Sequence, residues 1–172
     1  MTFTRKEYWL MTQVSSPSPL SPRIVEQHPK AVAAWVAQWL AVFGGNRLGV
    51  GAKHFLWHIF ANDHYPSVCA EPAYDQYVQH SAPEYVVLAN DRRHAVLVDQ
   101  RPDVPPLTTF NGWTDFYVFP TNLAWTLART HEEIWLGPYF ARHPDYETLN
   151  RANQMAVEKA RMIREVRGKG WV

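Results

Sequence analysis

Three histidines have the spacing and the neighbours that a metal centre would use. His54 and His58 stand four residues apart, so one helix could present both imidazoles to a single metal ion, and His131 could supply a third ligand. Zinc is the ion expected for such a set, in a small metal-dependent hydrolase. A zinc protease is disfavoured, because Phe55 stands where the glutamate of an HExxH motif would follow the first histidine. Hydrogen-bonded structural histidines, or a ligand pocket without metal, explain the same pattern.

His131 also has a second chemical interpretation, because it lies between Thr130 and Glu132 directly after a predicted strand. A carboxylate beside an imidazole holds the ring in one tautomer, and an imidazole held in this way can serve as a general base. His131 and Glu132 are therefore the candidate catalytic pair of a general-base hydrolase. The alternative is that these residues only fasten the turn before Gly137-Pro138.

The motifs of several other enzyme classes are absent from the sequence. There is no GxSxG nucleophile elbow. There is also no phosphate-binding P-loop, and Gly49 and Gly51 lack both the third glycine and the preceding strand of a dinucleotide-binding motif. The single cysteine, Cys69, excludes an intramolecular disulfide. Nucleotide-binding and serine-nucleophile enzymes are therefore disfavoured.

Aromatic residues make up 14% of the chain and include 8 Trp. Such a surplus is typical of a bulky core, and also of a core that presents an aromatic binding surface. On the second interpretation, aromatic and charged side chains outside the predicted helices would contact a partner. These side chains are Trp113, His131, Glu132, Trp135 and Tyr139.

A long helix is predicted near each end of the chain. His28-Pro29 supplies an N-cap and a proline at the first helical position, apolar residues recur at spacings of three and four, and glycines follow, which predicts a helix over residues 29–43. A second helix is predicted from Pro144 to about Arg167. Its alanines predict a close approach to the sheet. The buried stripe expected for it consists of Leu149, Ala152, Ala156, Ala160 and Ile163.

Two antiparallel hairpins are predicted between these helices. The segments 85–88 and 95–98 are apolar on both faces and flank a polar loop, so their hairpin should be central or covered on each side. The segments 116–119 and 125–128 flank a Pro-Thr-Asn turn and form the second hairpin. The aromatic segment 50–61 fits either a strand or a helix, and helix is favoured.

The predicted fold class is α+β, an antiparallel sheet of at least four strands packed by an N-terminal and a long C-terminal helix. Residues 1–22 are predicted to be a flexible Ser/Pro-rich leader, and residues 23–172 a single domain.

The formal net charge of +1 disfavours nucleic acid as a partner, because nucleic-acid binding needs an excess of Lys and Arg. No apolar run reaches the length of a membrane span, and the lone cysteine fits a reducing compartment, so a cytoplasmic protein without a membrane partner is expected.

Short motifs in the middle of the chain resemble those of a known family. They are the LWH motif within residues 54–60, Trp125-Thr126, Thr130-His131-Glu132 and Gly137-Pro138-Tyr139-Phe140. In this combination the chain resembles a bacterial family of small domains of unknown function, over about residues 50–141. The resemblance implies no activity, but it implies that the LWH segment and the THE–GPYF segment meet in space.

Small aromatic α+β proteins of bacteria often act as immunity proteins that neutralise a toxin, which is an analogy of size and style. The first functional hypothesis is therefore a non-enzymatic, cofactor-free protein-binding module of the immunity type. A nuclease target would commonly require an acidic inhibitor, and this chain is not acidic. The second hypothesis is the hydrolase, which would use His54, His58, His131 and Glu132, with zinc in its metal-dependent form.

Overall fold

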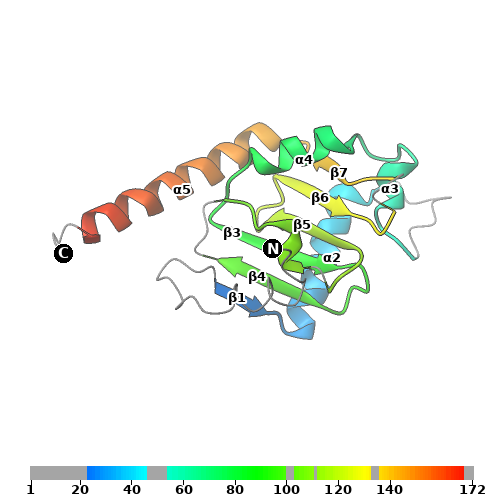
Figure 1. Cartoon of the computed structure of the whole chain (residues 1–172), viewed down its shortest axis with the longest axis horizontal. Helices are drawn as coiled ribbons and strands as arrows, with labels where there is room; N and C mark the ends of the chain where they lie inside the picture. The colour runs from blue at the N-terminus through cyan, green and yellow to red at the C-terminus, as the bar shows by residue number, and fades with distance from the viewer. Residues whose placement is uncertain (1–22, 46–53, 100–102, 111, 133–135, 169–172) are drawn as a thin grey trace, which may run out of the picture.

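The computed structural model describes residues 23–45, 54–99, 103–110, 112–132 and 136–168. The predicted leader lies outside these residues, so the division into a leader and one domain stays a prediction. The described chain is an α+β fold, in which a seven-stranded sheet carries helices on both faces (Figure 1). This confirms the predicted fold class. No helix in these ranges has the length and apolar content needed to cross a bilayer.

The strands are β1 (Arg23–Glu26), β2 (Val68–Cys69), β3 (Glu84–Ala89), β4 (Ala95–Asp99), β5 (Phe116–Pro120), β6 (Trp125–Arg129) and β7 (Tyr139–Arg142). The helices are α2 (Pro29–Phe43), α3 (His58–Ala61), α4 (Glu71–Val78) and α5 (Tyr146–Gly168), with a 3-10 turn η1 (Leu107–Phe110). The strand order is β1-β4-β3-β5-β6-β7-β2, and neighbouring strands are antiparallel.

Both predicted hairpins are confirmed, as β3–β4 and β5–β6. The first hairpin is central, as expected. Its β3 strand pairs with β5 on one side, and its β4 strand pairs with β1 on the other. Three strands were not predicted. β1 and β7 have four residues each and β2 has two, so none is long enough to show a clear alternation of polar and apolar residues.

Each face of the sheet carries its own hydrophobic core. Val86 and Leu88 point to the face covered by α2 and α3, whereas Tyr85 and Val87 point to the face covered by α4 and η1. Burial on both faces explains why the strands of the two hairpins are apolar throughout.

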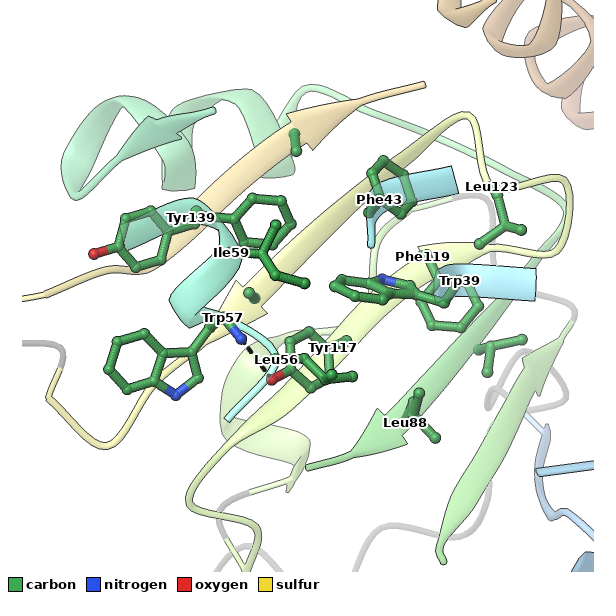
Figure 2. Packing of buried hydrophobic residues seen from close by; sticks show 14 of the residues in the cluster. Trp39, Phe43, Leu56, Trp57, Ile59, Leu88, Tyr117, Phe119, Leu123 and Tyr139 are labelled. Atoms are coloured by element: carbon green, nitrogen blue, oxygen red, sulfur yellow. Dashed lines mark hydrogen bonds between the residues drawn. The ribbon is translucent and has the colours of Figure 1, made fainter. Parts of the chain in front are cut away.

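The predicted helix over residues 29–43 is confirmed as α2, with the predicted cap. The His28 side chain accepts a hydrogen bond from the Lys30 backbone N–H at 3.2 Å. Trp39 and Phe43 are fully buried against the sheet, as Figure 2 shows.

The aromatic segment 50–61 is helical only at its end. Residues 46–53 are outside the described ranges, residues 54–57 form turns, and α3 begins at His58. The expected helix through both histidines is therefore wrong in the part that the structure describes. His54 precedes the helix and does not lie one helical turn behind His58 on the same face.

The C-terminal helix is confirmed as α5, but most of the predicted buried stripe is wrong. Leu149 is half-buried against the core and Ala156 is half-buried, whereas Ala152, Ala160 and Ile163 are exposed. The helix projects beyond the sheet (Figure 1). Its 23 residues rise about 34 Å, roughly twice the length of a typical strand, so only the first turns can pack on the sheet.

A pair of asparagines fastens α5 to the β5–β6 turn. Asn122 Nδ2 donates to Asn153 Oδ1 at 2.9 Å and to the Leu149 carbonyl at 3.0 Å. Asn153 Nδ2 donates back to Asn122 Oδ1 at 3.1 Å, and the same oxygen accepts from the Ala124 N–H. Asn153 is the buried residue of the helix, so these bonds form where water is excluded.

We expect Asn122→Ala to lower the free energy of unfolding by about 1–3 kcal/mol, because it leaves the buried Asn153 amide and the Ala124 N–H without their partners. A chain ending at residue 157 should lose less than about 0.5 kcal/mol, since the described residues that it loses, 158–168, are exposed apart from the half-buried Glu158. Urea denaturation measures both, with Asn62→Ala as the matched exposed asparagine. A large loss on truncation would show that the projecting part of α5 contributes to stability.

Candidate functional site

The pairing of β5 with β6 determines the position of the candidate site. Phe116, the first residue of β5, pairs with Arg129, the last residue of β6. Asp115, which directly precedes β5, therefore lies beside Thr130 and His131, which directly follow β6. A carboxylate and an imidazole are brought together in this way at one end of the antiparallel hairpin.

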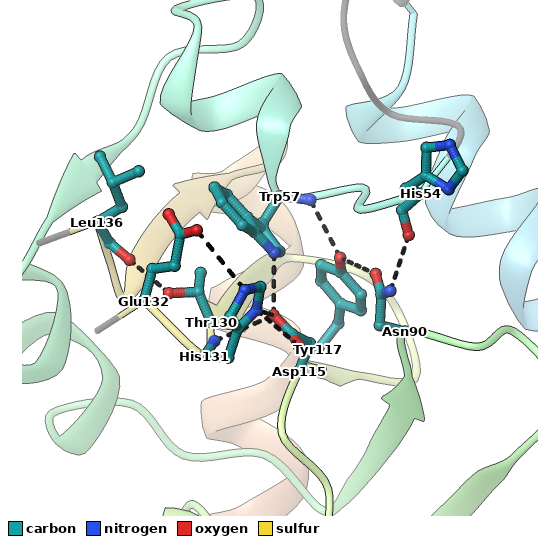
Figure 3. Close-up of polar contacts among 9 residues, drawn as sticks. All are labelled: His54, Trp57, Asn90, Asp115, Tyr117, Thr130, His131, Glu132 and Leu136. Atoms are coloured by element: carbon teal, nitrogen blue, oxygen red, sulfur yellow. Dashed lines mark hydrogen bonds and ion pairs between the residues drawn. The ribbon is translucent and has the colours of Figure 1, made fainter. Parts of the chain in front are cut away.

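Asp115 is only 7% exposed, and three groups donate hydrogen bonds to its carboxylate (Figure 3). The Trp57 indole N–H donates to Oδ1 at 3.0 Å, and the His131 backbone N–H donates to the same oxygen at 3.1 Å. His131 Nδ1 lies 2.9 Å from Oδ1 and 3.0 Å from Oδ2. The buried carboxylate thus holds the imidazole by one nitrogen and by its own backbone.

This carboxylate also favours the protonated form of His131. The hydrogen bond from Nδ1 to Asp115 raises the pKa of His131 above its usual value, because it favours the protonated ring. The side chain is 40% exposed, and its Nε2 lies 3.6 Å from Glu132 Oε1. His131 therefore presents an oriented, readily protonated imidazole to solvent beside a second carboxylate.

Aromatic rings form the wall beside the imidazole. The Phe55 ring centroid lies 5.1 Å from that of His131, and the Trp57 ring meets His131 edge-on at 6.1 Å. His58 packs against the same two rings, at 5.7 Å from Phe55 and 4.2 Å from Trp57. The LWH segment and the segment that contains His131 thus lie together, as the resemblance implied.

The three predicted zinc ligands do not form a metal site. Within the described ranges, which contain all three, no group of His, Cys, Asp or Glu side chains is arranged to hold a metal ion. The His54 ring is turned away from His131 in Figure 3, and its carbonyl accepts a hydrogen bond from Asn90 at 2.8 Å. His54 therefore contributes backbone to the site.

A buried tyrosine, Tyr117, holds the backbone of Trp57 in place. The Tyr117 hydroxyl accepts from the Trp57 backbone N–H at 3.0 Å and donates to Asn90 Oδ1 at 2.9 Å. Burial raises the pKa of Tyr117 well above its usual value, so the hydroxyl keeps its proton. Trp57 is thus fixed at its backbone by Tyr117 and at its indole by Asp115.

A surface hollow of about 420 Å³ adjoins the imidazole. Its lining includes Phe55, Trp113, Asp115, Asp91 and His94. Trp113 is half-buried, so part of its ring faces solvent. The lining therefore combines aromatic and acidic side chains, and Phe55 belongs both to this hollow and to the aromatic wall beside His131.

The remaining predicted contact residues have different positions. Glu132 lies beside His131, as expected. Tyr139 was expected at the surface, but it is only 6% exposed and its ring stacks on that of Trp57 at 6.4 Å. It is buried because it belongs to β7, a strand of four residues that was not predicted from the sequence. Trp135 lies outside the described residues.

The sequence patterns did not indicate the roles of Asp115, which holds the imidazole of His131, and of Trp57, which packs beside it. A signal for Asp115 was present, because it directly precedes a strand that was correctly paired with the strand before His131. Nothing local to Trp57 indicated its role.

One protein family matches this chain. A family described as a domain of unknown function, DUF4275, matches residues 41–140, which is more than half of the chain. The chain belongs to this family. The DUF4275 region contains Trp57, Asp115 and His131. No curated protein and no solved structure matches the chain. DUF4275 membership agrees with the resemblance to small domains of unknown function, and it assigns no activity.

Proposed function

We propose that this chain is a protein-binding module that neutralises a bacterial toxin in the manner of an immunity protein. Its contact surface would consist of Phe55, Trp113, His131 and Glu132, which we call the His131 surface. The observation that carries the proposal is the fixed imidazole. His131 is 40% exposed, yet both oxygens of the buried Asp115 carboxylate hold it in one orientation.

Pre-organisation makes such a group effective in binding. A side chain that is already held in one orientation loses little conformational entropy when a partner covers it. The residues that dominate binding energy are commonly aromatic or cationic, and well packed at their base. Phe55 and Trp113 provide the aromatic groups, His131 an imidazole whose pKa is raised, and Trp57 and Asp115 the buried base.

The charge of the chain supports a partner other than a nuclease. A nuclease inhibitor usually carries excess acidic groups that mimic the phosphates, whereas this chain has a formal net charge of +1. We therefore propose a toxin of another class. A cytoplasmic location is part of the proposal, and the exposed, unpaired thiol of Cys69 supports it.

The test combines capture with protection. The tagged full-length chain should retain one stoichiometric protein from its native host, and that protein should arrest growth when it is expressed without the chain. Trp113→Ala and His131→Ala should each weaken the complex by about tenfold or more. Arg161→Ala, a change on the projecting part of α5, should leave it intact. If Trp113→Ala and His131→Ala both retain capture and protection, the assigned surface is refuted.

One observation favours a second candidate function, a general-base hydrolase. Asp115 holds Nδ1 of His131, and Nε2 faces outward, which is the arrangement by which a carboxylate orients a catalytic imidazole. Nε2 could then take a proton from an attacking water molecule, with Glu132 beside it. Hydrolysis of simple esters and amides that disappears in His131→Gln and persists in His64→Gln would support this function. A chain inactive on such a panel that binds and silences a toxin would establish the first function instead.

A further inference from the structure

A second groove, of about 650 Å³, is lined by residues 65–68, which lead into β2, and by residues of α4, of β7 and of the segment before α5. Its lining is mainly apolar and includes Tyr65, Pro66, Val68, Phe140 and Pro144. A groove of this volume is in the range that binds small organic molecules. None of its lining residues belongs to the His131 surface, so this groove is independent of the function proposed above.

Arg142 is the one charged side chain among the described residues that line this groove. Its Nη2 donates to Gln76 Oε1 at 2.6 Å, and its guanidinium lies 4.4 Å above the Tyr146 ring. These partners are an amide oxygen and an aromatic ring, and neither neutralises the positive charge. The groove therefore presents a full cation at the edge of an apolar surface.

Tyr146, which contacts this guanidinium, is itself held by the buried residue His80. The Tyr146 hydroxyl lies 2.7 Å from Nε2 of His80, and the His80 Nδ1 side hydrogen-bonds to the Gln76 carbonyl. The His80 ring also packs against Phe140, with centroids 4.9 Å apart. Burial lowers the pKa of His80, so the ring stays neutral at pH 7. Arg142 is thus oriented from below by residues that are themselves fixed.

A planar guanidinium binds a carboxylate through two parallel hydrogen bonds, and the apolar lining favours a hydrocarbon over a second charge. We propose that this groove binds a small apolar monocarboxylate, with the carboxylate on Arg142 and the hydrocarbon part against Val68, Phe140 and Pro144. Arg142 is one cation without an anionic partner among the described residues, so it matches a ligand with one carboxylate. The groove volume of about 650 Å³ restricts the ligand to the size of a small molecule.

Titration calorimetry of the full chain with octanoate tests this assignment. Octanoate should bind saturably, whereas octanol and octylamine should bind at least about tenfold more weakly, because they lack the charge-assisted hydrogen bonds. Arg142→Gln should weaken octanoate binding by the same factor and leave octanol unaffected. Arg93→Gln, an exposed arginine of the β3–β4 loop, should bind octanoate as the wild type does.

Arg142→Lys keeps the charge but not the planar pair of donors, so it should retain an intermediate affinity. This variant serves if Arg142→Gln does not fold. Absence of saturable octanoate binding, equal binding of octanol, or unchanged binding by Arg142→Gln would each overturn the proposal. Tighter binding of a peptide with a free C-terminal carboxylate than of octanoate would overturn the assignment to a small molecule.

Discussion

Replacement of Asp115 by alanine should lower the free energy of unfolding by about 2–4 kcal/mol. The carboxylate accepts from the Trp57 indole and from the His131 backbone, and both donors would lose their acceptor at a position that is 7% exposed. The imidazole would lose its partner as well. Urea denaturation followed by tryptophan fluorescence measures the loss, and it also reports the altered environment of Trp57.

Asp91→Ala is the matched control, because Asp91 also pairs with a histidine but has a 45% exposed side chain. The exposed pair should contribute less than about 1 kcal/mol. Equal losses in the two variants would mean that the buried network around Asp115 contributes nothing beyond a surface ion pair.

Asp115→Asn should remove a pH dependence that the wild type shows. The pKa of His131 is raised in the folded state, so the folded protein holds its proton to higher pH than the unfolded chain does. The stabilisation is therefore complete below the unfolded histidine value of about 6.5 and is lost as pH rises through the raised value. Proton NMR of the imidazole should show the pKa of His131 falling in the variant. An unchanged pKa would contradict the role of Asp115.

Trp39→Ala should have an effect of similar or greater size, about 3–5 kcal/mol. The Trp39 ring is fully buried on α2 and packs against Phe43, Phe60 and Tyr117 at centroid distances of 5.1–5.9 Å. Its indole N–H also donates to the Thr126 hydroxyl at 3.0 Å. The substitution leaves a large cavity between α2 and the sheet together with an unpaired hydroxyl. Thermal and urea unfolding measure the loss.

Trp35→Ala controls for this loss, because Trp35 is on the same helix and is only half-buried, at 6.2 Å from Phe119. It should cost roughly half as much, in proportion to the smaller area buried. A double-mutant cycle of Trp39→Phe with Thr126→Val isolates the hydrogen bond, which should couple the two sites by about 1 kcal/mol. A smaller loss for Trp39→Ala than for Trp35→Ala would contradict the packing on this face.

Local patterns predicted much of the fold correctly. The α2 helix was predicted from its cap, its proline and its apolar spacing, and both hairpins from pairs of short apolar runs that flank a turn. The failures have physical causes. β1, β2 and β7 are too short to show a period, and the length of α5 relative to the sheet cannot be inferred from its own residues.

The candidate site divides in the same way. The position of His131 and Glu132 at the end of a strand follows from the sequence, because both the strand and its polar end are local features. The groups that hold His131 come from other parts of the chain and depend on the packing of the fold. Asp115 is 16 positions away from it along the chain, and the hydrogen bond from Trp57 to Asp115 spans 58 positions. The tertiary structure also placed Tyr139 in the core and His54 away from the imidazole. Contacts of this range depend on how the sheet and its covering segments pack, and no local pattern of residues encodes that packing.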